Sequence, residues 1–98
     1  MYVILWEFRP APGREPEFEK AYGPGGSWMA LFKRTPGYLG SELLHDADDF
    51  NRYLTLDRWE SADAYERFRV ARGADYESLD RECEGFTVHE ARIGAFQI

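Results

Sequence analysis

The sequence predicts an α+β domain with a ferredoxin-like βαββαβ fold, in which a four-stranded antiparallel sheet carries its helices on one face. Two observations support this class. Four segments alternate apolar and polar side chains with the period of two that a strand requires. Helical segments follow the first and the third of these, whereas only a short polar stretch joins the second to the third. The 98 residues suit a single domain spanning 1–98.

The first strand is predicted over Tyr2–Arg9 and ends at a segment rich in proline and glycine. A helix follows over Glu15–Tyr22, with a proline in its first turn, where a missing N–H costs nothing. The Gly23–Gly26 segment, GPGG, breaks this helix. Ser27 can cap a second helical piece that continues to Phe32.

The middle of the chain reads as a hairpin followed by a helix. Strands are expected over Tyr38–Asp46 and Arg52–Trp59, joined by the polar connection Ala47–Asn51. Ser61 offers a side-chain oxygen to the free N–H groups of a helix start. The helical region that it caps runs from Ala62 to about Glu84.

Two glycines modify the last elements. Gly73 is expected to kink or split the long helical region. The final strand is predicted over Phe86–Ile98, with a loosened stretch near Gly94.

The predicted strands are apolar on both faces, although the helices can cover only one. In the first strand Tyr2, Ile4, Trp6 and Phe8 oppose Val3 and Leu5, and in the third Leu54 and Leu56 oppose Tyr53 and Trp59. Strands of this kind need cover on both sides. A second copy of the chain is the simplest cover, because two-fold assemblies are the commonest oligomers. We therefore expect a homodimer built sheet against sheet.

Composition limits which binding partners and which cellular compartment are expected. The formal charge is −6 and the basic residues are scattered, so neither a nucleic acid nor a membrane is expected as a partner. The first residues lack the features of an export signal, and no run approaches membrane-spanning length. Cys83 is the one cysteine and is interpreted as a buried thiol in a reducing compartment. A soluble, cytoplasmic protein is expected.

The position of Trp59 is the best functional clue in the sequence. It is the last residue of a predicted strand, directly before a helix that carries Tyr65 and Phe68. An aromatic N–H donor at such a strand end can line a small-molecule pocket between sheet and helices. Core packing is the competing interpretation for Trp59, and also for Tyr65, which belongs to the buried stripe of its helix.

The strand that ends in Trp59, its continuation ESADAY and Phe68 resemble the corresponding segment of the antibiotic biosynthesis monooxygenase family. The closing stretch FTVHE at 86–90, followed by Ile93-Gly94 and Phe96, resembles that family too. The resemblance covers nearly the whole chain, and it implies a dimeric α+β barrel. Some family members oxidise anthrone-type rings to quinones with O₂ and without metal or flavin, others degrade haem, and many have no assigned reaction.

The resemblance also assigns residues. Trp59 matches a pocket tryptophan of the family, and Tyr65 matches a pocket tyrosine of its quinone-forming branch, so these two are the expected catalytic residues. Thr55 stands where that branch has an asparagine. The branch's helical arginine aligns with Leu79, or with Arg81 after a shift.

No cofactor and no metal are expected. The haem-degrading branch ligates iron through a histidine on its second helix, and this chain has none between His45 and His89. These two histidines lack a cysteine or carboxylate partner at zinc-ligand spacing. The GPGG segment at 23–26 lacks the features of a phosphate-binding loop, and a helix break or a pocket rim remains its interpretation.

The sequence thus predicts a cofactor-independent monooxygenase acting on an aromatic or polyketide-like molecule between helices and sheet. Trp28, Thr55, Asp57 and His45 are the expected substrate-binding residues. Asp57, Glu42 or His45 could act as the base, provided that the pleat points it inward. The alternative is a non-catalytic small-molecule-binding dimer of the same fold. An isomerase or decarboxylase-like activity rests on fold analogy alone.

Overall fold

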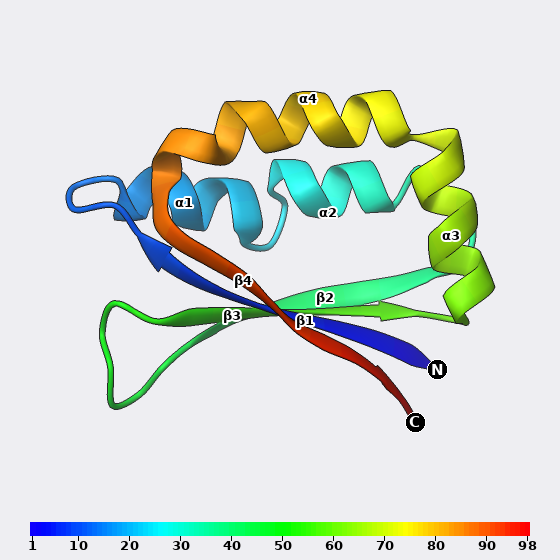
Figure 1. Cartoon of the computed structure of the whole chain (residues 1–98), viewed down its shortest axis with the longest axis horizontal. Coiled ribbons are helices and arrows are strands. Elements are labelled where there is room, and N and C mark those ends of the chain that lie inside the picture. The colour runs from blue at the N-terminus through cyan, green and yellow to red at the C-terminus, as the bar shows by residue number, and fades with distance from the viewer.

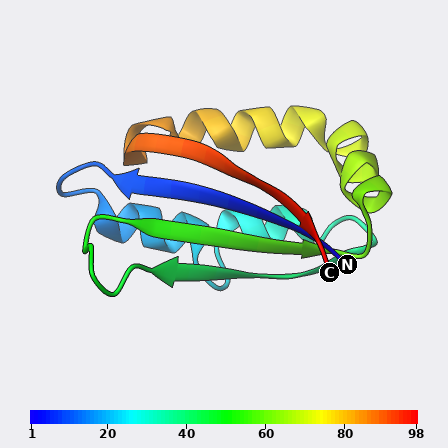
Figure 2. The same cartoon turned by 60° about the horizontal axis from the view of Figure 1, so that its bottom comes forward.

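Four antiparallel strands form one sheet in the order β2-β3-β1-β4, and the helices lie on one of its faces (Figure 1, Figure 2). The computed structural model describes all residues 1–98. Its strands are β1 (Tyr2–Pro10), β2 (Tyr38–His45), β3 (Tyr53–Trp59) and β4 (Thr87–Gln97). Its helices are α1 (Glu15–Tyr22), α2 (Ser27–Phe32), α3 (Ala62–Ala71) and α4 (Gly73–Cys83), followed by a 3₁₀ turn at Glu84–Phe86. The ferredoxin-like prediction is confirmed.

The long helical region predicted after β3 consists of two helices. Helix α3 ends at Ala71, and α4 starts at Gly73 in a new direction, so that α3 stands steeply at one end of the sheet while α4 runs above it (Figure 1). Arg72, between the two helices, has φ −122° and ψ 23°, outside the helical region. The split expected near Gly73 is therefore observed.

The start of α3 is fixed against the start of β2. Ser61 caps the helix by accepting a hydrogen bond of 3.1 Å from the Ala64 backbone N–H. Gly37 has φ +97°, and a Cβ built on it would lie 2.6 Å from the Ala64 Cβ. Only glycine allows the chain to approach the helix this closely. The contact brings α3 down over the ends of β2 and β3.

The break between α1 and α2 is also tight. A Cβ on Gly26 would lie 2.4 Å from the Lys20 carbonyl oxygen and 2.5 Å from that of Ala21. Because a side chain cannot fit there, the GPGG segment lets the chain turn directly over the end of α1. Helix α2 then continues in the same layer and carries Trp28 and Met29 over the sheet.

The hydrophobic core between helices and sheet is largely aromatic. Trp59, Phe18 and Phe68 have no exposed surface, and Ile4 and Phe8 pack with them from β1. The residues on the predicted stripe of the last two helices also pack against this core, namely Tyr65, Phe68, Tyr76, Leu79 and Cys83.

The opposite face of the sheet has no helix over it (Figure 2). Leu44 and Phe96 on this face are 41% and 49% exposed. Leu54 and Leu56 lie there as well, because their strand neighbours Tyr53 and Thr55 face the core. The two-sided apolar pattern of the strands is thus present in the structure.

Polar contacts lie toward both ends of this open face. Glu7 pairs with Arg52 at 2.5 Å and with His89 at 2.9 Å. Hydrogen bonds from both partners lower the pKa of Glu7. Arg58 pairs with Glu42 at 2.9 Å. None of the helices is long and apolar enough to cross a membrane.

Candidate functional site

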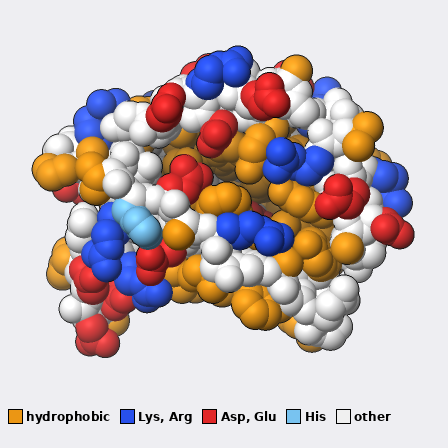
Figure 3. Space-filling view, in the orientation of Figure 1, with side chains coloured by type: hydrophobic (Ala, Val, Ile, Leu, Met, Phe, Trp, Pro, Cys, Tyr) orange, Lys and Arg blue, Asp and Glu red, His pale blue; other side chains and the backbone are white.

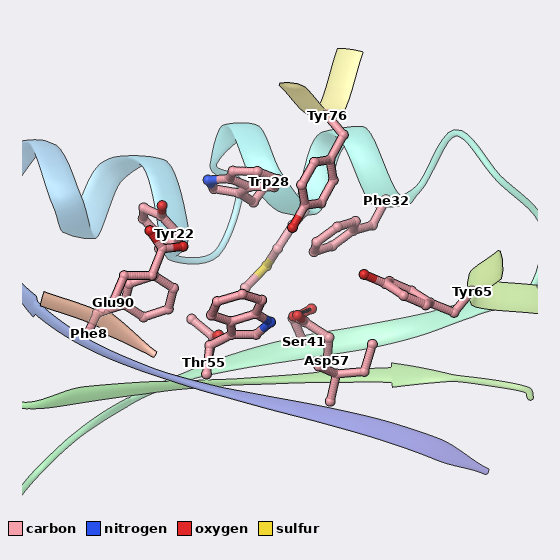
Figure 4. A pocket seen from close by; sticks show the side chains of 13 residues that line it. Phe8, Tyr22, Trp28, Phe32, Ser41, Thr55, Asp57, Tyr65, Tyr76 and Glu90 are labelled. Atoms are coloured by element: carbon pink, nitrogen blue, oxygen red, sulfur yellow. Dashed lines mark hydrogen bonds between the residues drawn. The ribbon is translucent and has the colours of Figure 1, made fainter. Parts of the chain in front are cut away.

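A narrow cavity lies between the sheet and helices α2, α3 and α4 (Figure 4). The space open to the centre of a water-sized sphere is about 40 Å³, enough for a few waters. Most of its lining is aromatic or aliphatic, with a small polar group on one side. The lining residues are Ile4, Trp6, Phe8, Tyr22, Trp28, Met29, Phe32, Ser41, Thr55, Asp57, Tyr65, Tyr76 and Glu90.

The cavity continues into a larger hollow of about 630 Å³, which Trp6, Tyr65, Tyr76 and Glu90 also line. This volume is in the range of small-molecule sites. The space-filling view shows a hydrophobic floor with basic and acidic side chains at the rim (Figure 3). The charged residues that line the hollow are Arg69, Asp80, Glu90 and Arg92. Together the two spaces form an apolar slot with a polar mouth.

Asp57 is one of two carboxylates of the sheet that line the cavity, the other being Glu90 of β4. Asp57 lies on β3 opposite Ile4 of β1 and Ser41 of β2, and it is only 9% exposed. Ser41 Oγ donates a hydrogen bond of 2.6 Å to its Oδ1. Burial raises the pKa of Asp57 to about 6, and the hydrogen bond from Ser41 opposes that rise. No basic side chain forms an ion pair with it, so the carboxylate retains its basicity.

Two tyrosines face Asp57 from the helices. Figure 4 shows the hydroxyl groups of Tyr65 and Tyr76 pointing into the cavity, that of Tyr76 from above and that of Tyr65 from the right. The Tyr65 hydroxyl accepts a hydrogen bond of 3.2 Å from Arg69, whose guanidinium lies 4.0 Å from the centre of the Tyr76 ring. Burial raises the pKa of Tyr76 to about 12, so this hydroxyl stays protonated at neutral pH. Arg69 thereby orders both rings at the mouth.

Trp28 contributes a wall to the cavity. Its ring packs edge to face against Tyr76, with centroids 5.0 Å apart, and at a tilt of 40° against Phe32, with centroids 5.9 Å apart. The Nε1 atom is buried and has no hydrogen-bond partner, and Figure 4 shows it on the side of the ring away from Asp57. Trp28 therefore presents carbon atoms, not an N–H donor, to a ligand.

Trp59, the predicted catalytic tryptophan, does not line the cavity. Its side chain has no exposed surface and packs behind Phe32 and Tyr65, with ring centroids 5.7 and 5.5 Å away. The Nε1 atom is buried without a partner. Helix α3 covers the end of β3 and closes Trp59 into the core. In this conformation Trp59 acts on the cavity only through the rings in front of it.

Of the three bases considered from the sequence, only Asp57 lies at the cavity. Glu42 points to the open face of the sheet and pairs with Arg58. His45 is on the inner side but at the far end of β2, where its ring stacks on Tyr53 at 4.1 Å and bonds to the Phe50 carbonyl. His45 does not line the cavity. Thr55 does line the cavity, from β3.

The lining residues that were not predicted as site residues include Trp6, Ser41, Tyr76 and Glu90. Trp6 pairs with Thr55 across the β1–β3 register, so its position on the inner row of β1 was the available signal. Burial and the nearby Asp80 raise the pKa of Glu90. No group of three or more His, Cys, Asp or Glu side chains gathers in the structure as a metal site would require.

The solved structures that resemble this chain include an oxygenase and a haem-degrading protein. An asparagine-to-alanine mutant of SnoaB, a cofactor-independent oxygenase from Streptomyces nogalater, matches with TM-score 0.80 and 22% identity, covering 99% of this chain and 91% of that one. MhuD, a heme-degrader from Mycobacterium tuberculosis with two hemes bound in its active site, matches with TM-score 0.72 and 20% identity, covering 100% of this chain and 95% of that one. At these identities the matches establish the fold.

Family membership rests on the sequence itself. No curated protein matches the chain significantly. The family model for antibiotic biosynthesis monooxygenase matches residues 1–73, from β1 to the start of α4. The match includes β3, the Ser61 cap and α3. This chain belongs to the antibiotic biosynthesis monooxygenase family.

Proposed function

We propose that the protein is a cofactor-independent monooxygenase that acts on a flat aromatic or polyketide-like molecule in the cavity above Asp57. Family membership supports the reaction class. The aromatic walls from Trp6, Trp28 and Phe32 suit a planar ring, because ring faces and edges pack favourably against one another. The inner space is narrow, so a ring enters from the hollow and displaces the side chains at the mouth.

The observation that carries the proposal is the buried, unpaired carboxylate of Asp57. A general base works best when its pKa lies near the working pH, and burial raises the pKa of Asp57 to about 6. At neutral pH most of it is ionised and able to accept a proton. Its place on the cavity floor puts it within reach of an acidic C–H or O–H of a bound ring.

The reaction follows from this arrangement. Asp57 takes a proton from the substrate and leaves a carbanion delocalised over the ring system. The carbanion passes one electron to O₂, and the carbon radical and superoxide combine to a peroxide. For an anthrone, the peroxide takes up a proton, and the resulting hydroperoxide loses water to leave a quinone. One oxygen atom therefore enters the product and the other leaves as water.

The cavity supplies the environment for the charged intermediate. The hydroxyl groups of Thr55, Tyr65 and Tyr76 border the same space as Asp57 and can donate hydrogen bonds to an enolate oxygen. The apolar remainder excludes water, which strengthens these interactions and limits premature reprotonation. Neither buried indole N–H, of Trp28 or of Trp59, takes part.

The assembly that we propose is a homodimer through the open face of the sheet. The apolar side chains there have no cover within the chain, and a stable interface requires roughly 1,000 Å² or more of buried surface. Pairing these faces leaves each cavity on the outer side of the dimer, beneath its own helices.

A non-catalytic ligand-binding dimer is the second candidate. It is favoured by the burial of the Trp59 indole N–H, which removes the residue that the family resemblance assigns to catalysis from direct contact with a ligand. A ligand that co-purifies with the protein and is not turned over under oxygen would select this candidate.

The proposed function is tested by product analysis. Metal-free protein is incubated with dithranol-like anthrones and isotopically labelled dioxygen, and products are identified by mass spectrometry. The proposal predicts quinones that carry one labelled oxygen atom per turnover, formed faster than in buffer. Intact substrate across a broad panel of phenols and anthrones would contradict it.

A further inference from the structure

Strand β2 contains a bulge directly beside the cavity. Tyr38 pairs with Trp59 and Ser41 pairs with Asp57, so the three-residue step on β2 matches a two-residue step on β3. Gly40 adopts φ +125° at the bulge, a conformation that other residues rarely take. In a regular strand, residues three apart point to opposite faces. The bulge turns Tyr38 and Ser41 to the same inner face, as bulges beside active sites often do.

This placement creates an ordered line of hydrogen bonds. Ser41 Oγ lies 2.6 Å from Asp57 Oδ1 and 2.6 Å from the Tyr38 hydroxyl oxygen. Ser41 has a single hydroxyl proton, which it donates to the ionised carboxylate of Asp57. The Tyr38 hydroxyl must then donate to Ser41. The line therefore has one direction while Asp57 is ionised, and it can reverse once Asp57 is protonated.

The line leads from the cavity to the edge of the sheet. Asp57 is buried on β3, whereas Ser41 and Tyr38 are half-buried on β2, which is an edge strand. A ring seated in the cavity covers Asp57 from the mouth. Beyond Ser41 the line ends at the half-buried Tyr38, on a strand with no further strand beside it.

The other ionisable groups around the cavity do not compete for this role. Tyr65 of α3, Tyr76 of α4 and Glu90 of β4 line the same space, but none is hydrogen-bonded to Asp57. The nearest charged pair on β2, Glu42 with Arg58, lies on the opposite face of the sheet. Ser41 is the only side chain that bonds to the carboxylate.

We propose that Ser41 and Tyr38 form a proton relay that returns Asp57 to its ionised state after each substrate deprotonation. This inference rests on the proposed function. Asp57 accepts the substrate proton, then donates through Oδ1 to Ser41 Oγ as Ser41 passes its own proton to the Tyr38 oxygen. Tyr38 releases its original proton to water at the β2 edge. Before the transfer, the Ser41 and Tyr38 hydroxyl groups rotate away from the protonated Asp57, and the transfer itself restores their original direction. Only O–H bonds break and form, and no electron moves.

The first experiment titrates Asp57 in ligand-free protein by carboxyl carbon NMR, so it does not depend on turnover. Removing the donor in Ser41→Ala is expected to raise the Asp57 midpoint by about one pH unit, since the ionised form loses its hydrogen bond. Tyr38→Phe should raise it less, because Ser41 still donates. Ser41→Thr should restore the midpoint, and Ser78→Ala, which removes an exposed hydroxyl on α4, should leave it unchanged.

The second experiment mixes protein with dithranol under anaerobic conditions, so that oxygenation cannot occur. Absorbance follows formation of the substrate anion, and a pH-indicator dye follows proton release to solvent. Wild type should show the two signals together. In Ser41→Ala and Tyr38→Phe the anion should still form, while proton release should lag by about tenfold or more.

The outcomes separate the relay from the oxygenase. An unshifted Asp57 midpoint in Ser41→Ala would overturn the hydrogen-bonded line. Shifted midpoints with undelayed proton release in both variants would overturn the relay. If wild type ionises dithranol with the expected release but consumes no oxygen, the relay holds and the proposed oxygenase function fails. If wild type forms no anion, Asp57 is not the base and both proposals fall.

Discussion

The indole of Trp59 packs edge to face against the ring of Tyr65, with centroids 5.5 Å apart and planes at 72°. Trp59 is fully buried, whereas Tyr65 lines the cavity. The tryptophan therefore supports the position of the tyrosine from behind. The direct catalytic role that the family resemblance implies for Trp59 would require its indole N–H to reach the cavity, from which Tyr65 separates it.

Trp59→Phe should destabilise the fold and weaken the site indirectly. The smaller ring leaves part of the core unfilled, and we expect the free energy of unfolding to fall by about 1–3 kcal/mol, measured by denaturant titration. Turnover should decrease only in part, since the cavity side chains remain. Complete loss of turnover with unchanged stability would show instead that the indole N–H reaches the substrate.

Tyr65→Phe should leave stability nearly unchanged and reduce turnover or ligand affinity, the reverse of what is expected for Trp59→Phe. The ring stays in place and only a hydroxyl bonded to Arg69 is lost, so the free energy of unfolding should change little. Turnover or ligand affinity should fall about tenfold, because a hydrogen bond to a charged intermediate is removed. Tyr53→Phe is the matched control, since Tyr53 lies outside the cavity beneath His45. Equal effects of the two substitutions would argue against a role for the Tyr65 hydroxyl.

Asp57→Asn should change how stability depends on pH. The folded-state pKa of Asp57, about 6, lies above the ordinary value of 3.8. Between these values the folded chain binds the proton more tightly than the unfolded chain, so wild-type stability falls as pH rises through this window. The loss amounts to about 3 kcal/mol and is complete above about pH 7.

In the Asp57→Asn variant the free energy of unfolding does not undergo this pH-dependent decrease. Its stability relative to wild type should therefore increase by about that amount between about pH 4 and about pH 7. Other shifted groups, such as Glu90, are present in both proteins and cancel in the difference. Denaturant titrations of both proteins across this range provide the measurement. A pH-independent difference would contradict the raised pKa.

A charge placed on the open face of the sheet should separate the proposed dimer. Leu56 lies there, and Leu56→Glu is expected to give a monomer because the new carboxylates would be buried without partners. Val70→Glu is the control, since Val70 is 85% exposed on α3, on the helical side. Light scattering at micromolar concentration measures the result. A monomeric wild type would remove the proposed assembly.

The fold followed from the sequence because its signals are local. Period-two alternation identified the strands, and Gly73 marked the split between the last two helices, where Arg72 leaves the helical region. The loosened stretch near Gly94 corresponds to a register shift between β1 and β4. Each of these features depends on residues close together in the chain.

The site was harder to predict from the sequence because it depends on distances between secondary-structure elements. The close approach of Gly37 to Ala64 brings α3 over the strand ends and buries Trp59. The residue pattern within β3 does not predict that contact. The bulge at Gly40 changes which residues of β2 face inward, so the orientation of Glu42 and His45 could not be read by simple alternation. Tyr76 and Glu90 reach the cavity from elements whose packing is set by the whole fold.

Oxygen consumption by metal-free protein with an anthrone substrate, compared between wild type and Asp57→Asn, tests the central claim most directly. An oxygen electrode should record uptake by wild type that rises with pH through about 6, as Asp57 ionises. The asparagine variant, which keeps the shape of the cavity but has no base, should reduce the rate by about a hundredfold or more. No uptake by wild type, or equal uptake by both proteins, would contradict the account.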